Sequence, residues 1–234
     1  MLVPKIVKQS IEDILQLIFP PVCIVCKSTI WNKTDPPLVC PKCLKSCKPV
    51  TREFIHAQIL NRLEDCFLDE LYVGLQFNET MQALIHHIKY MQMNGLAAKV
   101  ALFAQRFIEE EISAEKIDIA FPVPLHPLRE KERGYNQSAY IARGFFKQTG
   151  IIVRTDSLER NRPTQSQTKL NREERRSNVH NAFQLPRTET ILGKTVALVD
   201  DVVTTGATIN ECARVLKVGG AVKVVGIALA TPVN

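Results

Sequence analysis

Apolar residues recur along much of this chain at the spacing of an α-helix, and they predict several helices. The segment 80–111 carries two such apolar stripes, one in each half. Further helices are predicted at about 135–148 and in the stretch GATINECARVLKVGG, which is closed by glycine. Near the N-terminus, Ser10 and Asp13 have the spacing of a capping box, and a short amphipathic helix is expected to end at Pro20.

Runs rich in valine and isoleucine lie between the helical segments and predict strands. They are KIDIAFPVPL, GIIV, TVALVD and VKVVGIALA, and the stretch from Phe54 to Phe77 also contains strand-like runs, notably LYVGLQF. The polar, basic segment from Arg160 to Asn181 is predicted to be a long loop with some helix. Strands that alternate with helices favour an α/β fold, in which a parallel sheet is covered on both faces by helices.

The first 50 residues differ in character from the rest of the chain. The stretch CIVCKSTIWNKTDPPLVCPKC is rich in turn-forming residues and too poor in apolar ones to build its own core. We therefore expect two domains, one of residues 1–50 with a helix and the cysteine-rich stretch, and one of residues 51–234 with the α/β fold.

The charge of the chain suits an anionic ligand but does not identify it. The 234 residues carry a formal net charge of +6, and the sequence pI is about 9.0. A phosphorylated metabolite, nucleic acid or no anionic partner at all would each fit these values. No segment predicts a membrane span or a signal peptide, so a cytoplasmic location is expected, in which the cysteines are thiols or metal ligands.

Four cysteines have the spacing of a zinc site. Cys23 and Cys26 form one CxxC pair, and Cys40 and Cys43 form a second. Two such pairs can supply four thiolates to one tetrahedral zinc, and the metal would contribute the folding free energy that this segment lacks. A redox-active CxxC needs one pair only, and four thiolates leave no open coordination position. The pattern therefore predicts a structural zinc.

The other three cysteines are not expected to bind the metal. Cys47 lies four residues beyond Cys43 and is a spare candidate. Cys66 and Cys212 lie in stretches with apolar periodicity and are predicted to be thiols of the core.

Two adjacent acids, Asp200 and Asp201, directly follow the apolar run VALV. They fall at the carboxyl end of a predicted buried strand, where open α/β sheets place their ligand crevice. Because a buried carboxylate without a partner is costly, the two acids are expected to meet hydroxyl groups, a cation or a basic side chain.

The turn after the acids has the composition of a phosphate-binding loop. Its residues are Thr204, Thr205, Gly206, Ala207 and Thr208. Backbone N–H groups and hydroxyl groups at a helix start can bind phosphate, and the glycine allows a close approach. A ribose 5-phosphate fits, with its phosphate in the turn and its 2′- and 3′-hydroxyls on the acids. Walker A and dinucleotide-binding loops fit less well, because the turn has no lysine after a second glycine and only one glycine.

The stretch Val196 to Thr208, VALVDDVVTTGAT, resembles the motif that binds 5-phosphoribosyl 1-pyrophosphate (PRPP) in type I phosphoribosyltransferases. The four-cysteine segment, FPVPLHPLREKERGYNQS and RNRPTQSQTKLNREERRSNVHNAF narrow this resemblance to the ComF (ComFC) family of competence-associated proteins, over nearly the full chain. The resemblance implies a type I phosphoribosyltransferase-like parallel sheet with an N-terminal zinc ribbon and a small hood at about 51–80. It also implies PRPP and Mg²⁺ as ligands and a role in DNA uptake during natural transformation.

The resemblance assigns two further ligand segments. Leu125 and His126 would lie in a pyrophosphate loop, with Arg129 and Arg133 adding positive charge, although His126 is equally consistent with a surface histidine beside a proline. The second segment matches the flexible loop that closes over PRPP, and its alternatives are a solvated loop or a DNA contact. Its basic residues are Arg160, Arg162, Lys169, Arg172, Arg175 and Arg176.

Three functional hypotheses remain open from the sequence. The first is a phosphoribosyltransferase, in which an unknown acceptor displaces pyrophosphate from the anomeric carbon of PRPP. The second is a PRPP-binding module without turnover, and the third is a single-stranded DNA-binding adaptor that acts with other competence proteins. A homodimer is compatible with the fold family, but no sequence feature indicates one.

Overall fold

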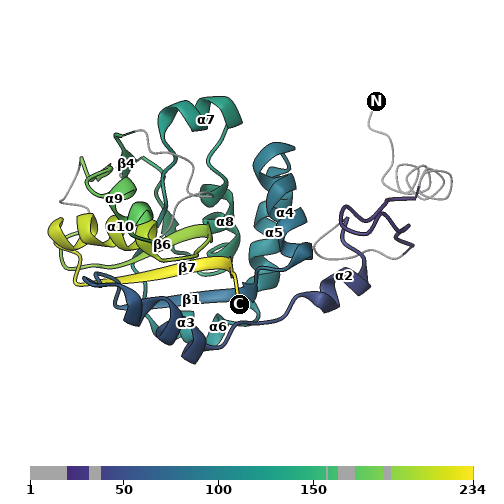
Figure 1. The fold of residues 1–234 in the computed structure, drawn as a ribbon, viewed down its shortest axis with the longest axis horizontal. Helices are drawn as coiled ribbons and strands as arrows, with labels where there is room; N and C mark the ends of the chain where they lie inside the picture. The colour runs from purple at the N-terminus through teal and green to yellow at the C-terminus, as the bar shows by residue number, and fades with distance from the viewer. Residues whose placement is uncertain (1–19, 32–37, 157, 163–171, 187–190, 234) are drawn as a thin grey trace.

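The structure is a computed structural model that describes residues 20–31, 38–156, 158–162, 172–186 and 191–233. Within these ranges the chain forms a five-stranded parallel sheet in the order β1-β7-β6-β2-β3, and an antiparallel pair of short strands, β4 and β5 (Figure 1). The sheet strands are β1 (Glu70–Gln76), β2 (Ile119–Pro122), β3 (Ile152–Val153), β6 (Thr195–Val202) and β7 (Lys223–Thr231). The short pair consists of β4 (Glu159–Arg160) and β5 (Phe183–Gln184). The predicted parallel sheet is confirmed.

The helices account for most of the segments with helical apolar spacing. They are α2 (Pro41–Ser46), α3 (Arg52–Gln58), the 3-10 helix η1 (Leu60–Arg62), α4 (Glu79–Tyr90), α5 (Asn94–Gln105), α6 (Glu109–Ala114), α7 (Pro127–Arg133), α8 (Gln137–Phe145), α9 (Arg172–Val179) and α10 (Ala207–Val218). The helices predicted within 80–111, at about 135–148 and after the acidic pair are therefore confirmed. The side chains of Asn78 and Asn136 cap α4 and α8, and Gly206 is the N-cap residue of α10.

Helices cover both faces of the sheet because its strands alternate two apolar sets of side chains. Ala197 and Val199 of β6 pack in one core cluster with α4, α5 and α8, whereas Val196 and Leu198 pack in a second cluster with α3 and α10. Figure 1 shows α4 and α5 beside α8. The cysteine-rich segment with α2 lies at one end of the molecule, next to α4.

The segment from Phe54 to Phe77 differs from its prediction. Only Glu70–Gln76 is a strand there, whereas Arg52–Gln58 is helical. The side chain of Thr51 accepts a hydrogen bond from the Phe54 N–H and caps α3, and the buried Ile55 and Ile59 lie one helical turn apart. Because β1 is an edge strand of the main sheet, that part of the expected hood at 51–80 belongs to the sheet itself.

The predicted loop between β4 and β5 contains more helix than expected, since α9 covers Arg172–Val179. The helix predicted before Pro20 lies outside the described residues. In the part of the chain that the structure describes, we find no helix both long enough and apolar enough to span a bilayer.

Gly144 allows α8 to approach α5 closely. A Cβ atom at this position would lie 2.6 Å from the carbonyl oxygen of Ala98 and 2.7 Å from the Cβ of Ala101. Replacing Gly144 with alanine is therefore expected to lower the free energy of unfolding by about 1–3 kcal/mol, as measured by chemical denaturation. Gly95→Ala in α5 is the control, because a Cβ there meets no atom within 4 Å. Equal effects of the two substitutions would contradict this account.

Candidate functional site

The sheet has a point at which successive crossovers diverge, and it lies between β6 and β2. From β6 the chain passes through α10 to β7 on one side, and from β2 it passes through α7 and α8 to β3 on the other. Ligands of open α/β sheets bind outside the carboxyl ends of the strands at such a point. The segments that follow β6 and β2 are the turn 203–206 and the stretch 123–126, so this edge of the sheet is the candidate site.

The turn after β6 forms a small cup. Asp200 and residues 202–209 line a cavity of about 20 Å³, which holds one water-sized group, such as a single phosphate oxygen. Gly206 is the N-cap residue of α10 and has a left-handed backbone with φ of 79°. A Cβ on Gly206 would also lie 2.9 Å from Cγ2 of Ile59. Both its conformation and its packing therefore require glycine.

The two adjacent acids have different partners. Asp201 is buried and has the basic partner that the sequence allowed, since Lys89 Nζ lies 3.0 Å from Oδ1 and 2.8 Å from Oδ2. Gln137 Nε2 donates a second hydrogen bond to Asp201 Oδ2 at 2.8 Å. Asp200 is half-buried, lines the cup and accepts a hydrogen bond from Ser138 Oγ at 3.1 Å. Of the two carboxylates, only Asp200 therefore lines the cup.

Asp200 is held in an environment that disfavours its charge. Burial raises the pKa of Asp200 to about 7, and the nearby charge of Asp201 acts in the same direction. Hydrogen bonds from the Asp201 N–H and from Ser138, together with the positive charge of Lys89, act in the opposite direction. A destabilised carboxylate at the mouth of a cavity is typical of a functional site.

The raised pKa of Asp200 predicts a pH-dependent cost to stability. A folded state that binds a proton more tightly than the unfolded state loses stability as the pH rises from 3.8, the ordinary pKa, to about 7. Asp200→Asn is neutral at every pH, so it is expected to raise the free energy of unfolding more at about pH 8 than at about pH 5. Urea denaturation at both pH values measures this difference. The same gain at both values would contradict the raised pKa.

Lys89 is charged although it lies largely below the surface. Burial alone would lower the pKa of Lys89, but the attraction of Asp201 and Asp200 outweighs burial and leaves the pKa raised. Lys89 and Asp201 are separated by 112 residues. The spacing of apolar residues predicts the helix that carries Lys89, but it contains no signal for the pairing of Lys89 with Asp201.

The predicted pyrophosphate-loop residues lie in three different surroundings. Leu125 lines a groove of about 650 Å³ together with Arg160. His126 is the N-cap residue of α7, and its Nδ1 accepts a hydrogen bond from the Leu128 N–H at 3.3 Å. Arg129 instead faces a cleft of about 450 Å³, which Lys89 also lines. The structure therefore gives His126 a capping contact and leaves Leu125 and Arg129 open to ligands.

The basic segment before α9 is only partly described. Arg162 donates hydrogen bonds to the carbonyl oxygens of Ser177, Asn178 and His180, so it closes the C-terminal end of α9. Lys169 lies outside the described residues, as do the side chains of Arg172, Arg175 and Arg176, whose backbone belongs to α9.

Arg160, one of the basic residues of this segment, also lies at the candidate site. Its guanidinium lies 5.3 Å from the ring centre of Phe183 and lines the groove with Leu125. Burial lowers the pKa of Arg160, and the charges of Asp200 and Arg129 also act on it. Arg160 therefore brings positive charge to the neighbourhood of Asp200.

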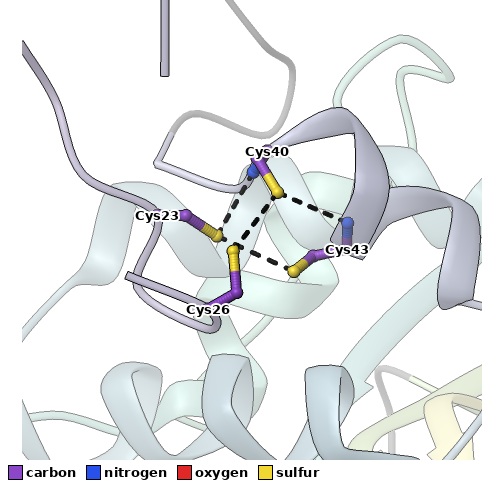
Figure 2. A group of neighbouring side chains, drawn as sticks. All are labelled: Cys23, Cys26, Cys40 and Cys43. Atoms are coloured by element: carbon purple, nitrogen blue, oxygen red, sulfur yellow. Dashed lines mark hydrogen bonds between the residues drawn. The ribbon is translucent and has the colours of Figure 1, made fainter. Parts of the chain in front are cut away.

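The four predicted metal ligands form one cluster. The sulfur atoms of Cys23, Cys26, Cys40 and Cys43 all lie within 4.8 Å of one another and point to a common centre (Figure 2). The Sγ atoms of Cys23 and Cys43 are 3.9 Å apart, and those of Cys26 and Cys40 are 3.6 Å apart. A tetrahedral site with metal–sulfur bonds of about 2.3 Å requires sulfur–sulfur distances of about 3.8 Å. The cluster thus has the dimensions of a four-thiolate metal site.

Local structure prepares these sulfur atoms for a metal. The N–H of Cys40 donates to Cys23 Sγ at 3.4 Å, and the N–H of Cys43 donates to Cys40 Sγ at 3.5 Å. Hydrogen bonding with Ser28 lowers the pKa of Cys26 to about 6, which favours its thiolate. Such bonds orient metal ligands and stabilise their negative charge.

The remaining cysteines are not part of the cluster. Cys47 is buried and contacts the carbonyl oxygen of Cys43 at 3.7 Å. Cys212 is a core thiol as predicted, but the prediction for Cys66 is wrong, because Cys66 is exposed in the connection between η1 and β1. Its apolar neighbours Leu63 and Phe67 pack against the core cluster that includes residues of α10, whereas Cys66 itself is exposed.

A comparison with protein families agrees with the parallel sheet and the turn after β6 described above. Residues 133–232 match the family model described as phosphoribosyl transferase domain. The matched range includes α8, β6, the cup and α10, so it covers Asp200 and all residues of the turn.

Curated relatives extend the match beyond this domain. The chain is 29% identical over 153 residues to competence protein F of Haemophilus influenzae, covering 64% of this chain and 67% of the relative. It is 30% identical over 155 residues to DNA utilization protein YhgH of Salmonella typhi, covering 63% and 66%. It is 29% identical over 192 residues to competence protein ComFC of Streptococcus pneumoniae, covering 78% and 76%. The first two alignments thus span about two thirds of each relative's length.

The sheet, the turn at its divergence point and the four-cysteine cluster agree with these similarities. The chain is a protein with a phosphoribosyltransferase domain that resembles the ComF (ComFC) family of competence-associated proteins.

Proposed function

We propose that this protein binds PRPP at the carboxyl ends of β6 and β2. The observation that carries the proposal is the cup after β6, which lies at the divergence point of the sheet and ends in the first turn of α10. The 5-phosphate would be bound by Thr204, Thr205, Gly206, Ala207 and Thr208, whose N–H and hydroxyl groups can donate to phosphate oxygens.

In this proposal the two acids have separate roles. Asp200 accepts hydrogen bonds from the ribose hydroxyls, because it is the acid that lines the cup. Asp201 can join it only if it gives up part of its contact with Lys89, and otherwise it holds Lys89 and Gln137 at the edge of the site. Leu125 and Arg160, in the groove, and Arg129 would lie near the diphosphate, with Mg²⁺ bound mainly through ligand oxygens and water.

Phosphoribosyl transfer from bound PRPP is the reaction we propose for this site. The bond between the anomeric carbon and the pyrophosphate oxygen breaks as an acceptor atom bonds to that carbon, and pyrophosphate leaves. Cationic side chains stabilise the charge that develops on the leaving group. The basic segment that contains Lys169, Arg172, Arg175 and Arg176 is the proposed cover for the diphosphate.

We further propose that the four cysteines bind one structural zinc ion. The cluster fits a tetrahedral site, and four thiolates fill it, so the metal would stabilise the N-terminal segment without reacting with substrate. A cytoplasmic location is consistent with free cysteines and a thiolate-bound metal.

The names of the relatives support a role in handling DNA during competence. We propose that the chain acts in DNA uptake, either through a phosphoribosylated product or by contact with single-stranded DNA beside other competence proteins. The formal net charge of +6 is compatible with contact with DNA. Binding of a labelled single strand that weakens steeply with added salt would support direct contact with DNA. Sedimentation would show whether the chain forms a homodimer.

Calorimetric titration with PRPP in the presence of Mg²⁺ tests the proposal directly. Saturable binding of one PRPP per chain is expected, and no detectable binding would reject it. Release of pyrophosphate on adding nucleobases, amines or oligonucleotides then separates a transferase from a binding module. Binding of PRPP without release of pyrophosphate under all these conditions would favour a PRPP-binding module over a transferase.

A further inference from the structure

The cysteine-rich segment has a one-sided charge. Between residues 20 and 50 the sequence contains five lysines and a single acid, Asp35, which lies outside the described residues. The described lysines are all exposed, and they are Lys27, Lys42, Lys45 and Lys48. A zinc ion bound by four thiolates would offset only part of this positive charge. The surface of the segment is therefore suited to an anionic partner.

Three of these lysines lie in α2 or directly after it. Lys42 and Lys45 are three residues apart in α2, so their side chains are neighbours on the helix surface, and Lys48 follows soon after the helix ends. Within the described ranges, none of the three forms an ion pair or a side-chain hydrogen bond. Lysines in this state can neutralise phosphates of a nucleic acid backbone.

The hairpin at residues 21–31, which carries the first CxxC pair, exposes an aromatic ring. Val22 pairs with Thr29 across the hairpin. Side chains alternate along extended backbone, so Ile30 is 5% exposed whereas the next residue, Trp31, is 75% exposed. Thr29 and Trp31 therefore share the outer face of the hairpin with Val22, which is 46% exposed.

An exposed ring beside lysines fits a single-stranded nucleic acid. Trp31 makes no ring contact with another residue in the part of the chain that the structure describes. An indole ring stacks on any base, and proteins that bind single strands without sequence preference combine such rings with a positive surface. A membrane surface fits less well, because binding there requires the long apolar face of an amphipathic helix rather than Trp31 and Val22 alone.

The metal site connects the ring to the lysines. Cys23 and Cys26 belong to the hairpin, whereas Cys40 is the N-cap residue of α2 and Cys43 lies within it (Figure 2). A metal bound by all four would therefore fix the hairpin against α2. Figure 1 shows this segment at one end of the molecule, away from β6 and α10, so it is separate from the cup.

We propose that the hairpin and α2 together form the surface on which single-stranded DNA contacts this protein, with a base stacked on Trp31. The phosphates of the strand would lie along the exposed lysines, which are Lys27, Lys42, Lys45 and Lys48. This inference rests on the proposed contact with single-stranded DNA and adds the place where the strand is bound. The zinc in this arrangement positions the DNA-binding residues without contacting the strand.

The fluorescence of Trp31 tests the proposal, because Trp31 is the only tryptophan of the chain. The full chain, purified without chelator, is titrated with a labelled thymidine oligonucleotide. Tryptophan emission is expected to be quenched in step with the rise in anisotropy of the label. By anisotropy, Trp31→Ala is expected to weaken binding about tenfold, whereas Trp31→Phe retains most of the affinity because a phenyl ring also stacks on bases.

Two double variants test the lysines. Lys42→Gln combined with Lys45→Gln is expected to reduce the slope of log affinity against log salt concentration by about 0.7 for each lysine removed. Lys116→Gln combined with Lys147→Gln is the matched control, since both of these lysines are exposed outside the cysteine-rich segment. Elemental analysis for zinc and thermal unfolding check that the variants are folded.

Four results would overturn the proposal. Binding of the oligonucleotide without a change in tryptophan emission would place the DNA elsewhere on the protein and leave the proposed DNA contact intact. Equal loss of slope in the two double variants would indicate a general charge effect. A shift of the emission with phosphatidylglycerol vesicles, but not with the oligonucleotide, would make the partner a membrane surface. No binding of the oligonucleotide would reject the DNA contact as well, whereas the PRPP site is still tested by its own titration.

Discussion

Replacing Asp200 with asparagine is expected to weaken PRPP binding about 100-fold while the fold is retained. The carboxylate lines the cup and would accept hydrogen bonds from two ribose hydroxyls, and losing charge-assisted bonds costs about 3 kcal/mol in total. The fold is expected to persist because asparagine keeps the shape of the side chain and can still accept from Ser138. Calorimetry with Mg²⁺ and PRPP measures the affinity.

The control for this prediction is Asp118→Asn. Asp118 accepts a hydrogen bond from the Thr195 N–H at the opposite end of β6, and it is exposed, so the same chemical change there leaves the site untouched. Unchanged PRPP affinity in Asp200→Asn would reject the ribose-binding role of this acid. Asp201→Asn is less informative, because it leaves the charge of Lys89 without its partner and so threatens the fold.

Replacing Cys23 and Cys40 together with serine is expected to remove one zinc ion per chain and to unfold the N-terminal segment. Each pair then loses one thiolate, and a structural zinc contributes about 10–16 kcal/mol of apparent binding free energy at neutral pH. Elemental analysis of protein purified without chelator measures the zinc content. Limited proteolysis is expected to cut the double variant within the cysteine-rich segment much faster than the unmodified protein.

Cys47→Ser provides the matched control for the zinc prediction. Cys47 is as buried as Cys43 and lies four residues away, but its sulfur is not in the cluster. This variant is therefore expected to keep its zinc. Absence of zinc from the unmodified protein, or equal zinc loss in Cys47→Ser, would contradict the assignment.

The sequence predicted those parts of the fold that depend on local periodicity. The buried strand before Asp200, the helix after Gly206 and the stripes of α4 follow from the spacing of apolar residues. The segment of α3 was wrongly predicted to be strand-like. Its helix is indicated by local signals, namely the capping residue Thr51 and the four-residue spacing of Ile55 and Ile59.

The parts of the site that the sequence did not predict depend on contacts between segments far apart in the chain. No local pattern indicates that Lys89 meets Asp201 or that Arg162 closes the end of α9. The alternation of side chains along a strand does imply that neighbouring acids point to opposite faces, so it could have shown that only one of the two acids lines the cup. The four cysteines were predicted because their short spacings restrict the geometry before any distant contact forms.

The helix α4 connects the cysteine-rich segment at its first turn with Asp201 of β6 at its last turn. At its first turn, Ser46 contacts Thr80 at 2.8 Å and accepts a hydrogen bond from Asn78, which ties the helix to α2. At its last turn, about 18 Å away by the rise of a 12-residue helix, Lys89 holds Asp201. Oxidation of the four clustered thiols would therefore disturb the segment that holds the first turn of α4, the helix whose last turn carries Lys89.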